Sequence, residues 1–110
     1  MIQTENYQCQ NILNILNKTI FVDIDGIITN ETLGHDFISR TPNQKNINII
    51  NEIYKNNKVV LYTSRYIIDY FVTKKWLKKN NVLYHRIIFN KPKYDIFVDD
   101  RCFNNFEEIK

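Results

Sequence analysis

The chain has 110 residues and a formal net charge of +3, with 44% hydrophobic and 25% charged residues. This length suits a single domain over residues 1–110 with its own hydrophobic core, and the composition is ordinary for a globular protein. No apolar run approaches the roughly 20 residues of a membrane span, and residues 1–10 lack the basic and apolar regions of a secretory signal. We therefore expect a cytoplasmic protein that makes no membrane contact, in which Cys9 and Cys102 are free thiols.

Strand-like and helix-like patterns alternate along the chain. The expected strands are residues 19–24, 58–62, 86–89 and 94–98. The expected helices are residues 5–17, 41–56, 66–79 and 105–109. Residues 26–40 contain both glycines and no clear period, which predicts an irregular loop or a small hairpin. The β-α-β-α-β order implies right-handed crossovers, and therefore an α/β domain in three layers with a mainly parallel sheet covered by helices.

Two helices carry further local signals. Thr41 is a candidate N-cap, with Pro42 in the first turn and Gln44 closing a capping box. In the helix over 66–79, the residues expected on the inner face are Ile68, Phe71, Val72 and Trp76. The same helix ends in a basic run of Lys74, Lys75, Lys78 and Lys79. Cations suit the carboxyl end of a helix, so the run indicates a solvated helix end rather than contact with nucleic acid.

The most informative stretch is residues 20–26, where the strand over 19–24 runs into Asp23, Asp25 and Gly26. Two carboxylates one residue apart point the same way on a strand and repel each other unless a proton or a cation lies between them. The pair is therefore a candidate Mg²⁺ site, although Asp-x-Asp-Gly also occurs in turns and calcium loops.

Polar residues also follow the other expected strands. Thr63, Ser64 and Arg65 come directly after the strand over 58–62, Lys91 precedes the last strand, and Asp99 and Asp100 follow it. Because ligands of a parallel sheet bind beyond the carboxyl ends of its strands, we expect these side chains to meet the Asp23 pair.

This order of residues resembles the four motifs of the haloacid dehalogenase (HAD) superfamily of phosphohydrolases. The matching segments are Phe21–Thr29 (FVDIDGIIT), Val59–Arg65 (VVLYTSR), Lys91 and Ile96–Arg101 (IFVDDR). The closing segment NKPKYDIFVDDR is similar to small capless HAD phosphatases of capsule and surface-polysaccharide synthesis, and to the KP…IDDR ending of HAD deoxynucleotidases. The resemblance implies a Rossmann-like sheet in the spatial order 3-2-1-4, with the strand over 19–24 central, and no cap domain.

The resemblance also implies a reaction, the hydrolysis of a phosphomonoester through an aspartyl-phosphate with Mg²⁺ as cofactor. It assigns Asp23 as the nucleophile, and Asp25 as the acid that protonates the leaving oxygen and then the base that activates water. Thr63 and Lys91 would bind the phosphoryl oxygens. The metal would be held by the Asp23 carboxylate, the Asp25 carbonyl and one of the final pair, with Asp100 as the direct ligand and Asp99 behind it.

Several assignments have plainer alternatives. Thr63 or Ser64 could cap the following helix, and Lys91 could be a surface lysine. Arg65 and Arg101 suit structural ion pairs better than substrate contacts. Cys102 is expected to be a small core residue, and His35 and Asp36 lie in a loop that overhangs the site in family members.

Two rival function classes share parts of this pattern. A response-regulator receiver domain places its acidic pair first and its Lys-Pro last, which is the reverse of the order here. A catalytically silent HAD-fold module that binds phosphate or metal is the remaining alternative. The expected partner is a small phosphorylated substrate, either a sugar phosphate or a nucleotide, and a small capless domain is compatible with homo-oligomerisation.

Overall fold

The computed structural model describes residues 12–106, so Cys9, most of the helix expected over 5–17 and the end of the one expected over 105–109 lie outside the described residues. The elements in chain order are strand β1 (Thr19–Val22), 3-10 helix η1 (Phe37–Ser39), helix α2 (Gln44–Ile53), strand β2 (Lys58–Tyr62), 3-10 helix η2 (Ile67–Asp69), helix α3 (Tyr70–Lys79) and strand β3 (Arg86–Ile88). In the described part of the chain, no helix has the length and apolar content needed to cross a membrane.

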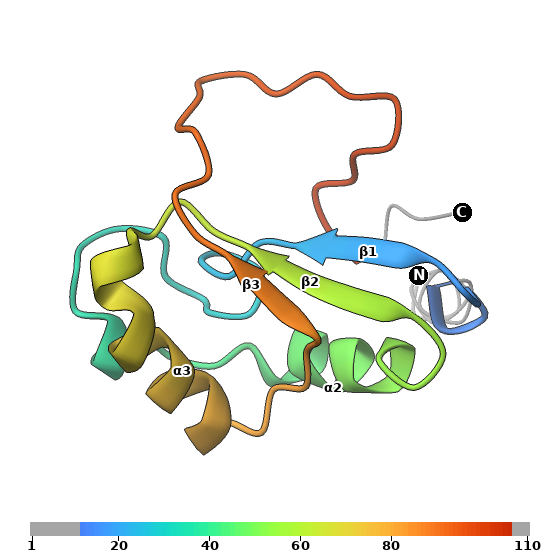
Figure 1. The fold of residues 1–110 in the computed structure, drawn as a ribbon, viewed down its shortest axis with the longest axis horizontal. Helices are drawn as coiled ribbons and strands as arrows, with labels where there is room; N and C mark the ends of the chain where they lie inside the picture. The colour runs from blue at the N-terminus through green and yellow to red at the C-terminus, as the bar shows by residue number, and fades with distance from the viewer. Residues whose placement is uncertain (1–11, 107–110) are drawn as a thin grey trace, which may run out of the picture.

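The three strands form one parallel sheet in the order β1-β2-β3 (Figure 1). Phe21 of β1 lies opposite Val60 of β2, and Leu61 of β2 lies opposite Ile87 of β3. The run KVVLY forms β2 as expected, because its β-branched residues fit a buried central strand. The prediction of an α/β protein with a parallel sheet is therefore confirmed.

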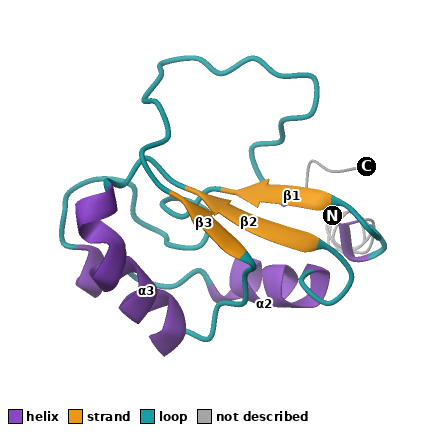
Figure 2. Cartoon of the chain, in the orientation of Figure 1, coloured by secondary structure: helices purple, strands orange, loops and turns teal. Residues whose placement is uncertain are grey.

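Helices α2 and α3 lie on the same side of the sheet (Figure 2). The hydrophobic core lies between these helices and the sheet. It consists of aliphatic side chains around one tryptophan, Trp76, which is 1% exposed. Its fully buried members include Ile47, Ile50 and Ile53 of α2, with Val59 and Leu61 of β2 and Leu77 of α3.

Helix α2 begins later than the sequence pattern suggested. The N-cap is Asn43, whose side chain accepts a hydrogen bond from the backbone N–H of Asn46 at 3.1 Å. Thr41 does not cap the helix, because its own N–H donates to Glu31 Oε1 at 2.7 Å and Pro42 forms an isolated bridge with Thr29. The strand-like pairing of this segment moves the helix start two residues along the chain.

Helix α3 also differs from the expected phase. Residues 67–69 form the 3-10 turn η2, in which side chains advance faster around the axis than in an α-helix. The expected inner residues Ile68 and Phe71 are 85% and 82% exposed, and the buried face is made by Thr73, Trp76 and Leu77.

The fourth strand, expected over 94–98, does not form in the described structure. Residues 92–105 run as an exposed arc that leaves the sheet beyond β3 (Figure 1). Ile96 and Val98 are 82% and 91% exposed, while Phe106 is buried in the core. Consequently β1 is an edge strand of the described sheet rather than its centre, and Cys102 is exposed rather than a core residue. An apolar, β-branched segment favours extended chain, but it pairs only where contacts hold it to a neighbouring edge.

Candidate functional site

The site begins where the chain leaves β1 and turns. The carbonyl of Ile24 accepts hydrogen bonds from the backbone N–H groups of Ile27, Ile28 and Thr29 at 3.3, 2.8 and 3.1 Å. Gly26 allows this turn because its φ is +90°, which L side chains rarely adopt. The turn leaves Asp23 and Asp25 on either side of buried Ile24 at the carboxyl end of the sheet.

Asp23 lies beside Lys91. Its Oδ1 accepts from the N–H of Ile24 at 2.8 Å, and its Oδ2 is 3.4 Å from Lys91 Nζ. Burial raises the pKa of the Asp23 carboxyl above its usual range, against the opposing effects of Lys91 and the Ile24 N–H. The side chain remains 39% exposed, so one face of the carboxylate is open to a ligand.

Thr63 connects the end of β2 to the segment that carries Lys91. Its N–H donates to the carbonyl of Ile88 at 3.0 Å, and its carbonyl accepts from the N–H of Lys91 at 2.9 Å. Its hydroxyl oxygen accepts from the N–H of Arg65 at 3.1 Å, so it closes a local turn and does not cap α3. The structure therefore brings Thr63 and Lys91 to the same edge of the sheet as Asp23, as the sequence predicted.

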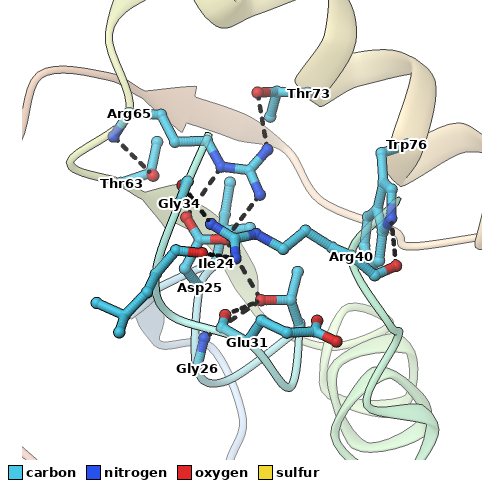
Figure 3. Close-up of polar contacts among 12 residues, drawn as sticks. Ile24, Asp25, Gly26, Glu31, Gly34, Arg40, Thr63, Arg65, Thr73 and Trp76 are labelled. Carbon is cyan, nitrogen blue, oxygen red and sulfur yellow. Dashed lines mark hydrogen bonds and ion pairs between the residues drawn. The ribbon is translucent and has the colours of Figure 1, made fainter. Parts of the chain in front are cut away.

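Asp25 is bound by two arginines (Figure 3). Arg65 donates from Nε to Oδ2 at 2.9 Å and from Nη2 to Oδ1 at 2.7 Å, and its Nη1 donates to Thr73 Oγ1 of α3 at 3.0 Å. Arg40 Nε lies 3.4 Å from Oδ1. The expectation that Arg65 forms a structural ion pair is confirmed, and its partner is a candidate catalytic residue.

Arg40 is a further residue of the site, and the sequence pattern did not identify it. It lies in a loop with no helical or strand period, yet it is only 7% exposed. Its Nη1 and Nη2 donate to the carbonyls of Leu33 and Gly34 at 2.6 and 3.0 Å, and its own carbonyl accepts from Trp76 Nε1 at 3.0 Å (Figure 3). The Phe37 ring also contacts both arginines, because the Arg40 and Arg65 guanidiniums lie 5.2 and 4.0 Å from its centre. A single arginine in an irregular loop gives no sequence signal of such burial.

A small pocket of about 120 Å³ adjoins this cluster. Its lining includes Asp25, Arg40 and Arg65, together with exposed His35 and Lys93. Asp36 does not line it and instead precedes the 3-10 helix η1. The pocket shows that Asp25 faces space in which a ligand group could lie.

Asp99 and Asp100 are not brought to Asp23. Both are exposed on the arc, where Asp99 Oδ1 accepts from the N–H of Arg101 at 2.8 Å. Within residues 12–106 no three acidic, histidine or cysteine side chains gather closely enough to hold a metal ion. Because Arg65 takes both oxygens of Asp25, Asp23 is left as a single carboxylate ligand, and the described arrangement does not fit a Mg²⁺ site.

The described geometry defines a small α/β protein with acidic, basic and hydroxyl side chains at the carboxyl end of a parallel sheet. No protein-family model and no curated protein matches the chain. The crystal structure of a structural-genomics target from Vibrio cholerae is similar, with a TM-score of 0.72 and 24% sequence identity over 84% of this chain and 89% of that one. At this identity the likeness concerns the fold alone.

Proposed function

We propose that this protein is a capless HAD-type phosphatase, which hydrolyses small phosphomonoesters through an aspartyl-phosphate on Asp23. The observation that carries the proposal is the approach of Lys91 Nζ to Asp23 Oδ2, at 3.4 Å, from a separate loop at the carboxyl end of the sheet. A half-exposed carboxylate beside a cation suits attack on a phosphoryl group whose negative charge must be neutralised.

In the proposed reaction, an oxygen of Asp23 attacks phosphorus, and the bond from phosphorus to the leaving oxygen breaks. Asp25, which takes up a proton from solvent when substrate binds, gives this proton to the leaving oxygen and then takes one from the water that hydrolyses the aspartyl-phosphate. The Thr63 hydroxyl and Lys91 Nζ bind the phosphoryl oxygens throughout. Free alcohol and inorganic phosphate leave, Asp23 is regenerated, and Asp25 releases its proton to solvent and returns to the carboxylate.

The proposal includes a fourth strand. The outer edge of β1 has no strand partner in the described structure, and Tyr94–Val98 is a strand-like segment between two anchored points. Lys91 is anchored by its N–H to Thr63, and Phe106 is anchored in the core. Pairing of residues 94–98 with β1 gives the order 3-2-1-4 and carries Asp99 and Asp100 toward Asp23. A three-layer sheet with helices on both faces belongs to this proposed state.

The same pairing would create the Mg²⁺ site. Asp23, the Asp25 carbonyl and Asp100 would hold the ion, with Asp99 orienting a ligand behind them. Mg²⁺, when bound, would neutralise phosphoryl charge and fix the ester for in-line attack. An ion that binds the native state alone raises the melting temperature, so we expect millimolar Mg²⁺ to stabilise the wild type and to stabilise Asp100→Asn less.

The decisive experiment measures hydrolysis of p-nitrophenyl phosphate with Mg²⁺ by wild type, Asp23→Asn and Asp25→Asn. Asp23→Asn should lose turnover because an amide is a far poorer nucleophile. Asp25→Asn should still be phosphorylated by this activated ester but release phosphate slowly, so mass spectrometry should find a phosphate adduct on its Asp23 peptide. Glu52→Gln, an exposed carboxylate of α2, is the matched control. Full activity in Asp23→Asn would exclude the nucleophile assignment.

One observation favours a second candidate, a HAD-fold module that binds phosphate or metal without catalysis. Both oxygens of Asp25 are occupied by Arg65, which leaves the proposed acid without a free oxygen. Under this alternative, the wild type binds inorganic phosphate with Mg²⁺ in calorimetry, yet it releases no p-nitrophenol and forms no adduct on Asp23.

A further inference from the structure

Asp25 lies beside two guanidiniums but accepts hydrogen bonds from only one of them. Two guanidiniums face this one carboxylate, and Arg65 takes both of its oxygens. Arg40 Nε forms an ion pair with Oδ1 at 3.4 Å, but this buried donor makes no hydrogen bond. A buried donor that makes no hydrogen bond costs on the order of 1–3 kcal/mol, and the ion pair with Asp25 offsets only part of this cost, so the missing hydrogen bond calls for an explanation.

Arg40 cannot make the missing hydrogen bond by moving. Its Nη1 and Nη2 donate to the carbonyls of Leu33 and Gly34. Its guanidinium lies over the Phe37 ring, and its backbone carbonyl accepts a hydrogen bond from Trp76. The Nε atom is thus held in a fixed position, and the Arg40 side chain is only 5% exposed. The group that can move is the Asp25 carboxylate, which is 19% exposed and borders the pocket.

We propose that Arg40 is a positioning residue for Asp25. Arg65 holds the carboxylate in the resting arrangement that the structure shows. When substrate binds, Asp25 rotates and one oxygen accepts a hydrogen bond from Arg40 Nε. The other oxygen leaves Arg65, takes up a proton from solvent and faces the leaving oxygen of the ester, to which it gives that proton. Arg40 therefore keeps Asp25 anchored while freeing the oxygen that catalysis needs.

This inference rests on the proposed function and resolves its main difficulty. The rotation conserves the number of hydrogen bonds from guanidiniums to Asp25, because the bond from Arg65 Nε is lost and one from Arg40 Nε is gained. Arg65 stays in place through Thr73, so it can recapture Asp25 after product leaves. The pocket beside the cluster supplies room for the released oxygen and for the nearest atoms of the leaving group.

The test uses Arg40→Lys, which keeps the positive charge but lacks the Nε donor and has one ammonium group in place of the two Nη donors. The probes are p-nitrophenyl phosphate and phenyl phosphate, which have nearly the same shape but differ in their need for a general acid. We expect kcat/KM for phenyl phosphate to fall at least about tenfold, with the value for p-nitrophenyl phosphate within about threefold of wild type. Asp25→Asn should show the same split. An equal fall on both esters, or no fall on either, would overturn the positioning role.

Arg65→Lys provides an independent test that does not depend on the folding of the Arg40 variant. If the working contact of Asp25 is with Arg40, Arg65→Lys should keep at least about a third of the phenyl phosphate kcat/KM. Selective loss of phenyl phosphate hydrolysis in Arg65→Lys would show that Arg65 orients the acid, and would refute the inference.

A spectroscopic measurement reads the contact directly. Orthovanadate, a phosphoryl analogue, should slow hydrogen exchange of the Arg40 Nε–H in the NMR spectrum of the wild type and leave it unchanged in Asp25→Asn. An unchanged Nε–H in the wild type, while p-nitrophenyl phosphate is hydrolysed, would sink the inference alone. A wild type that hydrolyses neither ester would remove the proposed function and the inference with it.

Discussion

Replacement of Arg65 by methionine should strongly destabilise the protein. The guanidinium is 2% exposed and makes two hydrogen bonds to Asp25 and one to Thr73. Methionine fills similar space but leaves a partly buried carboxylate without its main partner. Removing one member of a buried ion pair typically costs about 3–5 kcal/mol.

The lower end of that range applies here. Asp25 keeps 19% exposure and Arg40 Nε at 3.4 Å, both of which compensate part of the lost interaction. We therefore expect a loss of about 3 kcal/mol, out of a total of roughly 5–15 kcal/mol for a domain of this kind. With an m-value of about 1.5 kcal/mol/M, the urea midpoint should fall by about 2 M, and the melting temperature by about 12 °C or more.

The assay is urea unfolding of wild type, Arg65→Met, Asp25→Asn and the double variant. The double-mutant cycle isolates the coupling between the two side chains. Arg86→Met, at an exposed position of β3, is the matched control and should change stability by less than about 0.5 kcal/mol. A loss below about 1 kcal/mol for Arg65→Met would refute the view that this pair holds the loop, the strand end and α3 together.

Three further changes test other parts of the structure by denaturation. Because burial raises the pKa of Asp23 above 3.8, the folded state favours the neutral carboxyl. The stability of the protein therefore falls as pH rises through the folded-state pKa. Without metal, Asp23→Asn should have a higher melting temperature than wild type at pH 7 but not at pH 3. Asn57→Ala should cost about 2–3 kcal/mol, because it removes hydrogen bonds to the Lys18 N–H and to two carbonyls, and a loss near zero would contradict this. Gly26→Ala should cost about 1–3 kcal/mol, and more than Gly34→Ala, since both have positive φ but only the new Cβ at Gly26 meets Thr32, at 2.9 Å.

Much of the sheet follows from local pattern. The run over 58–62 is apolar and β-branched, and it forms β2 at the predicted residues because a central strand is buried on both faces. The start of α2 was displaced to Asn43 because Thr41 and Pro42 take part in contacts with distant residues, which a capping pattern does not contain. The face of α3 shifted because a 3-10 turn precedes it, and apolar spacing alone does not separate the two helix types.

The candidate site was predictable only where it follows strand ends. Asp23, Thr63 and Lys91 lie at the carboxyl edge of a parallel sheet, and this edge follows from strand order. Arg40 could not be found in this way, because its burial depends on carbonyls of its own loop and on the Trp76 indole. The strand expected over 94–98 depended on pairing with β1, a long-range contact that β-propensity does not determine.

The position of Trp76 has a practical consequence for optical work. It is the single tryptophan of the chain, so the intrinsic indole emission of the protein comes from one buried ring. Its N–H is bonded to the backbone of Arg40, and its helix carries Thr73, which holds Arg65. Fluorescence should therefore respond to loosening of the arginine cluster. A rearrangement confined to the arc over 92–105 should leave the emission unchanged. One unlabelled signal can thus distinguish loosening of the arginine cluster from a rearrangement of the arc.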